Sequence, residues 1–354
     1  MTHMTTLSFS TDADGARARP TMRDVAALAG VSLKTVSRVI NAEPGVSPDL
    51  TARVSRAIDQ LEFRPNLAAS SLRRSDGRTA SIGVVLEDIA NPYSAAVHRA
   101  VEDVARSHGL IVLAGSVDED PDRERRLAAA FIARRVEGMI VVPTASDQSY
   151  LVNEQRAGMP IVFIDRPPIH LDADVVLSAH RDGASTGVRH LIEYGHRRIA
   201  FLGDLASIRS AQERFDGYAD ALASIGLPIG QDLVLHDLRS SGLAMVATMG
   251  LLDGPTPPTA IFASQNLITI GVLRALRARL MERRIALVGF DDVPLADLLV
   301  PGVTVVAQDP VRIGQIAATT LFRRIAGDRG PAGQHVVETT LIPRGSGEIA
   351  PAAV

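Results

Sequence analysis

The sequence predicts an α/β core of two doubly wound parallel-sheet subdomains, preceded by an all-α helix-turn-helix headpiece and a hinge helix. Three observations predict this fold. Two short helical segments flank a glycine and are followed by a third within residues 21–64. A short leucine-bearing segment then follows a Pro-Asn pair in residues 65–78. From residue 79 on, short apolar runs alternate with helical stretches, which is typical of parallel βαβ units with right-handed crossovers.

The first helix of the headpiece is defined by the residues at its two ends. Thr21 is a good N-cap, and Asp24 three residues later can form the reciprocal hydrogen bond of a capping box. Gly30 ends the helix because glycine adopts the left-handed C′ conformation at little cost. The apolar stripe of this helix is expected to consist of Val25, Ala26, Leu28 and Ala29.

The second and third helices follow from the same kind of signal. Ser32 caps a second helix over residues 33–41. Ser47 followed by Pro48 starts a third helix. The apolar positions are Val36, Val39 and Ile40 in the second helix, and Val54, Ile58 and Leu61 in the third. Two short helices around a glycine turn, braced by a third, make a helix-turn-helix domain.

The outward face of the second helix predicts contact with duplex DNA. We expect its exposed residues to lie near the N-terminal half, which faces base edges in the major groove. Arg38 is expected to pair with a guanine, and Lys34 to reach a base or a phosphate. Leu33 can pack on a thymine methyl group. The alternative is an ordinary three-helix bundle whose exposed charges are only solvated.

The segment after the third helix predicts a hinge. Pro65 stops the third helix, and Asn66 can cap a further short helix over residues 67–73. Because so short a helix is unstable alone, we expect it to order only when DNA and a partner copy hold it. Leu72 is then an apolar wedge for the minor groove, with Arg73 and Arg74 on the flanking phosphates.

The remaining chain carries alternating strand and helix patterns. Strands are expected at 81–86, 110–114, 138–142, 160–164, 198–202, 233–236, 260–262 and 285–289. Helices are expected at 93–107, 122–135, 183–194, 213–225 and 267–280. About 270 residues are too many for one compact sheet, so two sheets are expected.

Charge and composition set further limits. The formal net charge is −3, yet residues 17–78 carry 11 basic and 6 acidic side chains. A basic N-terminal segment followed by an acidic remainder is typical of a DNA-binding module joined to a domain with a different function. The chain has no cysteine, no signal-peptide pattern and no apolar run of about 18 residues, so a cytoplasmic protein without membrane contact is expected. Residues 1–20 are expected to form a disordered tail.

Residues 21–74 resemble the headpiece and hinge of the lactose-repressor/purine-repressor (LacI/GalR) family. The signature D-V-A-x-x-A-G-V-S-x-x-T-V-S-R-V-I-N is unbroken from Asp24 to Asn41, and the hinge pattern P-N-x-x-A-x-x-L-R follows. Ser70 departs from the arginine usual in the family, which puts one hinge contact in doubt. The predicted DNA-binding residues are Thr21, Leu33, Lys34, Thr35, Ser37, Arg38, Asn41, Asn66, Ala69, Leu72 and Arg73.

The body, residues 79–349, resembles the effector-binding core of the same family, which is similar to the periplasmic sugar-binding proteins. Ordered motifs carry this resemblance, among them I-A-N-P-Y at 89–93, I-D-R-P at 164–167, E-R-F-D-G-Y at 213–218 and G-F-D-D at 289–292. The resemblance implies three chain crossings, near 178–181, 308–310 and 333–336. Subdomain one is then about 79–178 plus 310–333, and subdomain two about 181–308 plus 336–349.

The resemblance also implies an effector site in the cleft, at the carboxyl ends of strands. The matching positions are Asn91, Tyr93, Asp165, Arg166, Arg214, Ser264 and Asp291. Other interpretations stay open: Asp291 and Arg214 as a structural ion pair, Arg166 as a charge at the cleft rim, and Asn91 as a helix cap. A sugar or sugar derivative is the effector that the family implies; a nucleoside or an acidic metabolite is the alternative.

Some positions depart from the family pattern in this core. Ser264-Gln265-Asn266 replaces an Asp-containing turn, Leu238-Arg239 stands where an aromatic is usual, and residues 280–284 lack the usual Gly and Pro-x-Asp. These departures weaken the assignment of the effector but leave the fold unaffected.

The resemblance implies a ligand-responsive, sequence-specific transcriptional regulator, by family default a repressor. It would bind a palindromic operator as a homodimer under allosteric control, without a cofactor. Whether the ligand releases DNA or promotes its binding is not readable from the sequence. The tail at 346–354 has no leucine heptad, which favours a dimer over a tetramer.

Two other classes of protein fit less well. A transporter's solute-binding protein requires a signal peptide and has no headpiece. An enzyme on this scaffold would need a nucleophile, metal or nucleotide motif. The histidines match no metal-ligand pattern, and no G-x-S-x-G, G-x-G-x-x-G or P-loop motif is present. No enzymatic activity is therefore expected.

Overall fold

The computed structural model describes residues 20–40, 43–64, 79–144 and 147–352. The chain divides into two compact units, Met1–Thr79 and Ala80–Val354. The first unit holds three helices: α1 (Met22–Ala29), α2 (Leu33–Ile40) and α3 (Pro48–Gln60). The second unit holds two six-stranded sheets with helices on both faces of each. The predicted helix-turn-helix headpiece and two-sheet α/β core are thereby confirmed, and the predicted hinge helix at 67–73 lies outside the described residues.

The headpiece is built from the predicted caps and apolar positions. Gly30 takes a left-handed conformation with φ 63° and ends α1. Ser47 caps α3, its hydroxyl accepting from the Leu50 N–H, and Pro48 occupies the first turn. The Arg53 guanidinium donates to the Ala29 carbonyl at 2.7 Å and so ties α3 to the end of α1. The buried core of this unit consists of Val25, Ala26, Ala29, Val36, Val54, Ala57 and Phe63.

One predicted core position of the headpiece is wrong. Leu28 was expected in the apolar stripe of α1, but its side chain is 40% exposed. At about 100° per residue, the buried Val25, Ala29 and Ala26 lie within one arc of the helix, and Leu28 lies beyond the edge of that arc, outside the narrow face that meets α2 and α3. Asn41, the predicted last residue of the second helix, lies outside the described residues.

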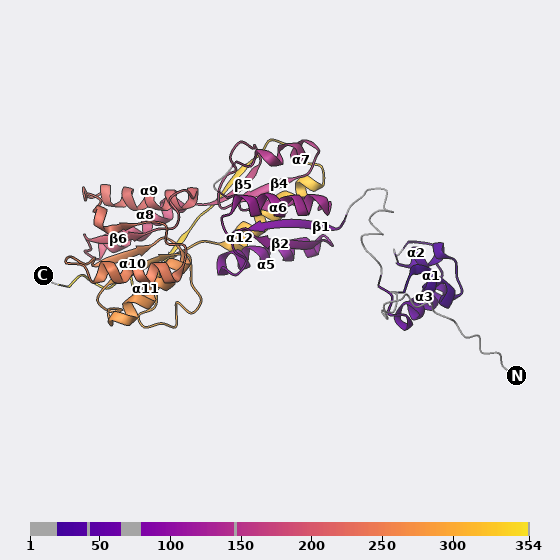
Figure 1. Cartoon of the computed structure of the whole chain (residues 1–354), viewed down its shortest axis with the longest axis horizontal. Helices are drawn as coiled ribbons and strands as arrows, with labels where there is room; N and C mark the ends of the chain where they lie inside the picture. Colours follow the sequence, from indigo (N-terminus) through magenta and orange to yellow (C-terminus); the bar gives the residue numbers. More distant parts are fainter. Residues whose placement is uncertain (1–19, 41–42, 65–78, 145–146, 353–354) are drawn as a thin grey trace. The chain divides into compact units, whose positions relative to one another are not determined.

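The first sheet of the core has the strand order β11-β5-β4-β3-β1-β2, and its pairs are all parallel. Helices α5 and α12 pack on one face and α6 on the other (Figure 1). The strands are β1 (Ser81–Leu86), β2 (Ile111–Ser116), β3 (Met139–Val141), β4 (Ile161–Ile164), β5 (Asp174–Ser178) and β11 (Gln334–Val337). The helices are α5 (Pro92–Ser107), α6 (Pro121–Ala133), α7 (Val152–Arg156) and α12 (Pro310–Ile325), with a 3-10 turn η1 (Ser149–Leu151).

The second sheet has the order β12-β10-β9-β8-β6-β7. Helices α8 and α9 cover one face, and α10 and α11 the other (Figure 1). The strands are β6 (Ile199–Leu202), β7 (Val234–Leu235), β8 (Ala260–Ala263), β9 (Ala286–Phe290), β10 (Thr304–Ala307) and β12 (Thr340–Ile342). The helices are α8 (His180–Glu193), α9 (Arg209–Ala223), α10 (Ser241–Leu252) and α11 (Asn266–Arg279), with a 3-10 turn η2 (Gln231–Leu233).

Three chain crossings join the two halves of the core. The chain leaves the first sheet after β5 and enters α8 of the second half at His180. It returns between β10 and α12, which packs against the first sheet. It crosses a last time between β11 and β12, at residues 338–339, because β11 pairs with β5 in the first sheet. This third crossing falls later than the expected 333–336.

The sequence did not reveal every strand. Strands β5, β10, β11 and β12 were not among the expected runs. Each has three to five residues, a length at which prediction from the apolar pattern is uneven, since β3, with three residues, was among the expected runs. One pair also departs from the parallel rule, because β12 runs antiparallel to β10 at the sheet edge. In the part of the chain that the structure describes, no helix is long and apolar enough to span a bilayer.

Candidate functional site

The outward face of α2 presents the residues expected to read DNA. Leu33 and Lys34 are exposed in the first turn of α2, and Leu33 is 40% exposed although it is apolar. Thr35 faces back toward the turn, where its N–H donates to the Ser32 hydroxyl at 3.1 Å. Ser37 is half-buried. A solvated leucine beside a lysine at the start of this helix is a surface suited to a groove.

Arg38 differs from the expectation in two ways. It lies in the last turn of α2, not near the N-terminal half. Its guanidinium also folds back on the following loop, donating to the Pro44 carbonyl and lying 3.6 Å from the Glu43 carboxylate. To reach a base, Arg38 must exchange these loop contacts for contacts with DNA.

The Thr21 N-cap is held by Asp24. The Asp24 carboxylate accepts from both the N–H and the hydroxyl of Thr21, each at 2.7 Å. The hydrogen bond from the Thr21 hydroxyl is the main cause that lowers the pKa of Asp24. The other predicted DNA contacts, Asn41, Asn66, Ala69, Leu72 and Arg73, lie outside the described residues.

In the core, one cavity gathers the side chains that follow the strands of both sheets. Seven strands contribute at their carboxyl ends: β1, β3 and β4 from the first half, and β6, β8, β9 and β10 from the second. The cavity encloses about 40 Å³, room for about three water molecules at roughly 10–15 Å³ each. Its lining includes Asn91, Tyr93, Asp165, Arg166, Arg214 and Asp291, which are six of the seven predicted effector residues. The seventh, Ser264, is fully buried, and its carbonyl accepts from Arg214.

The best-connected carboxylate of this cavity is Asp165. It follows β4 in a left-handed conformation with φ 70°, which turns its side chain into the cavity. Its carboxylate accepts from the Arg166 Nε at 3.1 Å and from the Ser210 hydroxyl at 3.0 Å. Burial opposes ionisation of Asp165, but the contact with His180 and the charges of Arg166 and Arg214 hold its pKa below the ordinary value.

Arg166 is fixed from both sides. Its two terminal nitrogens each donate to one oxygen of Glu119 at 2.9 Å, and both side chains are almost fully buried. This fork geometry holds the guanidinium plane. Burial raises the pKa of Glu119 although Arg166 opposes the rise. Arg166 is thus a buried, doubly paired charge and not a charge at the cleft rim.

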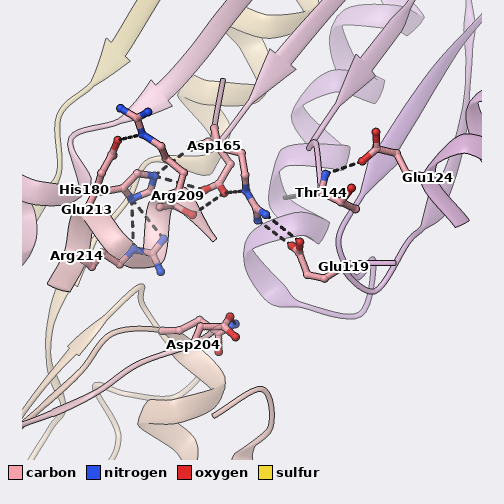
Figure 2. A network of polar contacts seen from close by, with 12 residues as sticks. Glu119, Glu124, Thr144, Asp165, His180, Asp204, Arg209, Glu213 and Arg214 are labelled. Atoms are coloured by element: carbon pink, nitrogen blue, oxygen red, sulfur yellow. Dashed lines mark hydrogen bonds and ion pairs between the residues drawn. The ribbon is translucent and has the colours of Figure 1, made fainter. Parts of the chain in front are cut away.

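His180 joins this group to Arg214. The Arg214 guanidinium lies 3.3 Å from His180 Nδ1 and donates to the Ser264 carbonyl at 2.8 Å. Because a guanidinium only donates, Nδ1 must accept, so the proton of a neutral His180 lies on Nε2, facing Asp165. Figure 2 shows these contacts running from Arg214 through His180 and Asp165 toward Glu119. Arg214 also lies over the Phe290 ring, 4.3 Å from its centroid.

Contacts between the two halves of the core close the cavity. Asn91, after β1, exchanges two hydrogen bonds with Asn266, at the start of α11, at 2.7 and 3.3 Å. Ser210 of α9 donates to Asp165. At the surface, Arg239 from the second half donates to the Asp118 carbonyl at 2.8 Å. The structure is therefore that of a closed cleft.

Two of the open interpretations are decided by these contacts. Asn91 caps α5, because its Oδ1 accepts from the Tyr93 N–H at 3.0 Å, and it also reaches across the cleft. Asp291 accepts from Gln308, while Arg214 binds His180 and Ser264, so the alternative of a structural Asp291–Arg214 ion pair does not describe the contacts of either residue.

Sequence reasoning missed several residues of this site. Glu87, Glu119, Asp204, Gln265 and Gln308 line the cavity or hold its arginines. All of them stand within three residues of a strand's carboxyl end, where polar residues of an α/β fold converge. For residues after the expected strands, that position was the available signal. His180, which orders the network, also stands two residues after a strand, β5, but neither β5 nor β10, which precedes Gln308, was among the expected strands.

Two family models match the chain. Residues 21–66 match bacterial regulatory proteins of the lacI family, and residues 188–347 match a periplasmic binding protein-like domain. The HTH-type transcriptional regulator PtxS of Pseudomonas aeruginosa is 35% identical over 335 residues, covering 93% of this chain and 96% of that protein. The ribose operon repressor of Escherichia coli is 32% identical over 310 residues, covering 86% and 93%.

Solved structures agree with these relatives. The lac repressor dimer bound to operator and an anti-inducer superposes with a TM-score of 0.79 at 26% identity, covering 94% of this chain and all of that one. A complex of the transcriptional regulator CelR with cellobiose gives a TM-score of 0.68 at 30% identity, covering 93% of this chain and all of that one.

Proposed function

Because this chain belongs to the LacI family of bacterial transcriptional regulators, we propose that it is a repressor that binds a palindromic operator as a homodimer. A sugar or sugar derivative in the core cleft would control that binding. The observation that carries the proposal is the closed cavity at the carboxyl ends of seven strands, crossed by hydrogen bonds between the two halves. Such a cavity can couple a ligand to the relative position of the halves.

The headpiece supplies the sequence-specific contacts in this proposal. Each α2 enters a major groove with Leu33 and Lys34 at its leading end, and Arg38 turns from its loop to a guanine. Because a two-fold dimer presents two copies of this surface, the site it reads is a palindrome. Support comes from the solved lac repressor, which is a dimer on its operator.

Exposed apolar side chains support association of two copies. On α10, Leu243 and Val246 are exposed, and the loop after β9 exposes four further large apolar residues within six positions. These are Leu295, Leu298, Leu299 and Val300. Exposed apolar surfaces of this kind are typical of contacts with another protein. In a homodimer, the second copy would cover them.

The cavity favours a ligand rich in hydroxyl groups. Its carboxylates and amide oxygens accept hydrogen bonds, and each sugar hydroxyl donates one. Arg166 is already paired with two carboxylates and Arg214 donates to the Ser264 carbonyl, so an acidic metabolite would have to displace these contacts to bind either guanidinium. Relatives whose names refer to ribose and cellobiose support a sugar. The present volume of about 40 Å³ is too small for a sugar, so the halves must separate before it enters.

The coupling mechanism follows from the three crossings. Opening and closing the cleft rotates the first half of the core, which is connected directly to the hinge, residues 65–78. That rotation changes the spacing at which two hinges meet the minor groove. A coupling free energy of only about 1–3 kcal/mol changes operator affinity roughly five- to 150-fold.

A ligand screen with a DNA readout tests this proposal. We expect a neutral or basic sugar to raise the melting temperature of the protein and to change operator affinity at least about fivefold, whereas sugar acids leave both unchanged. Differential scanning fluorimetry finds the ligand, and fluorescence anisotropy with a labelled operator measures the coupling. A ligand that binds the cleft but leaves operator affinity unchanged would contradict the proposed control.

The hinge gives a second prediction. Leu72→Ala should weaken operator binding because it removes the apolar wedge that opens the central base step. The ligand affinity of the same variant should stay near the wild-type value, since Leu72 precedes the core. Anisotropy titrations measure the first quantity and calorimetric titration the second. Full operator affinity in the Leu72→Ala protein would refute the wedge.

A further inference from the structure

The cavity carries more negative than positive charge. Glu87, Asp165, Asp204 and Asp291 line it, against two guanidiniums, those of Arg166 and Arg214. Both guanidiniums have partners already: Arg166 pairs with Asp165 and Glu119, and Arg214 binds the Ser264 carbonyl and His180. Because the hydrogen-bond partners of Arg214 are neutral, its charge acts on the lining carboxylates, but the lining still has four carboxyl groups for two guanidiniums.

Two of these carboxylates face the cavity from opposite halves of the core. Glu87 directly follows β1 of the first sheet, and Asp204 follows β6 of the second. Asp204 accepts from the Leu205 N–H and from the Gln265 amide at 3.3 Å, both of which are neutral. Within the described ranges of the chain, neither Glu87 nor Asp204 forms a salt bridge. Figure 2 shows Asp204 outside the network of dashed contacts.

A buried amide oxygen beside this pair also lacks a donor. Gln265 is 6% exposed and lines the cavity, and its Oε1 has no hydrogen-bond partner, while its nitrogen binds Asp204. Gln308 Oε1, also at the cavity, is unpartnered too. A buried acceptor without a donor is destabilising, so this side of the cavity suits a ligand group that donates several hydrogen bonds.

We propose that the effector carries a protonated amine beside its hydroxyl groups, and that Glu87 and Asp204 hold this ammonium between the two halves of the core. The effector class is then an amino sugar or amino polyol. This inference rests on the proposed function of the cleft as the effector site. An ammonium offers three donors and one positive charge, which matches two carboxylates and a neighbouring amide oxygen.

Electrostatics supports an ammonium over the other ligand classes. Burial, together with the charges of Glu119 and Asp204, raises the pKa of Glu87 to about 8. Without a cation this carboxyl therefore keeps a proton at neutral pH. A bound ammonium leaves the carboxyl buried but places a positive charge beside it, which favours the ionised form. A sugar acid or phosphate meets repulsion from the same groups. Among the described residues no cluster of three or more acidic or histidine side chains is arranged to hold a metal ion.

Matched pairs of compounds test the inference on the full chain. D-glucosamine is compared with D-glucose, and tris(hydroxymethyl)aminomethane with pentaerythritol, which replaces the amine by a fourth hydroxymethyl group. D-gluconate serves as the anionic probe, and phosphate or HEPES as the buffer. We expect the amine of each pair to raise the melting temperature more than its neutral partner, and gluconate to have no effect.

Variants locate the effect. Glu87→Gln combined with Asp204→Asn should weaken the affinity for the amines about 30-fold or more, since each change removes a close charge partner. Affinity for the neutral compounds should hardly change. Glu193→Gln, at an exposed position at the end of α8, removes a charge away from the cavity and should leave all affinities as they are. Calorimetric titration measures each dissociation constant.

Each outcome separates this inference from the proposed function. If a neutral compound or gluconate stabilises the protein as well as the amines do, the amine is refuted, while a ligand effect on operator affinity still supports the proposed function. If amines bind the double variant as tightly as the wild type, Glu87 and Asp204 are not their site. If none of the five compounds stabilises the protein, the amine inference falls, and the effector proposal loses its support with it.

Discussion

Arg38→Ala is expected to weaken operator binding about 30-fold to 10⁴-fold and to relax the preference at one base position of each half-site. A guanidinium paired with a guanine contributes about 1–3 kcal/mol of discrimination, and a dimer makes the contact twice. This loss of affinity is partly offset. In the absence of DNA, Arg38 contacts the Pro44 carbonyl and the Glu43 carboxylate, and the wild-type protein must break these contacts to bind the operator. Anisotropy titrations against operators with single base changes measure both quantities.

Glu43→Gln is the matched control for this variant. It removes the ionic partner of Arg38 and leaves the guanidinium in place. Operator affinity should then stay near wild type, because the exposed pair contributes little. Should Glu43→Gln weaken binding as much as Arg38→Ala, the arginine acts by shaping the loop after α2. Should Arg38→Ala keep the wild-type base preference, the groove contact is refuted.

Asp165→Ala is expected to lower the stability of the core by about 3 kcal/mol, or roughly 6–12 °C in Tm. The variant removes an acceptor of Arg166 and of Ser210 and leaves His180 facing an empty position. Arg166 keeps its bidentate partner Glu119, which limits the loss. Because Asp165 connects both halves, ligand-induced stabilisation should also disappear. Differential scanning calorimetry measures Tm with and without ligand.

Asp220→Ala serves as the control for Asp165→Ala. Asp220 also pairs with an arginine, Arg181, at 2.6 Å, but both side chains are exposed. The variant should unfold near the wild-type temperature and keep its response to ligand. A similar loss of stability in the two variants would show that the buried network contributes no more to the stability of the core than the exposed ion pair does. An unchanged ligand response in Asp165→Ala would exclude this carboxylate from the effector site.

The headpiece was predictable from sequence because its signals are local. Gly30, Ser47 and Pro48 act within a few residues of their own position, and the structure places each at the helix end predicted. Leu28 was misjudged because only the packing of α2 and α3 decides which face of α1 is covered. The orientation of Arg38 likewise depends on the conformation of the loop after α2, which could not be predicted from the sequence.

The core shows the same division between local and distant causes. That polar residues after strands gather at one edge follows from the parallel topology, and six of seven predicted residues line the cavity. The hydrogen-bond and ion-pair partners of these residues do not follow from the topology. Glu119 meets Arg166 from 47 positions away, and Arg239 reaches the Asp118 carbonyl across 121. The first contact depends on how the segments after β2 and β4 pack within the first half, and the second on how the two halves close. No periodic pattern in the sequence encodes either.

The central claim is that two headpieces bind a symmetric duplex and that a ligand in the core controls the affinity of this binding. The most direct test is the affinity of the purified protein for duplexes selected from a random library, measured with and without the ligand that stabilises the core. We predict selection of one palindromic sequence and a change in its affinity of about fivefold or more on adding that ligand. Equal affinity for selected and random duplexes under both conditions would contradict the claim.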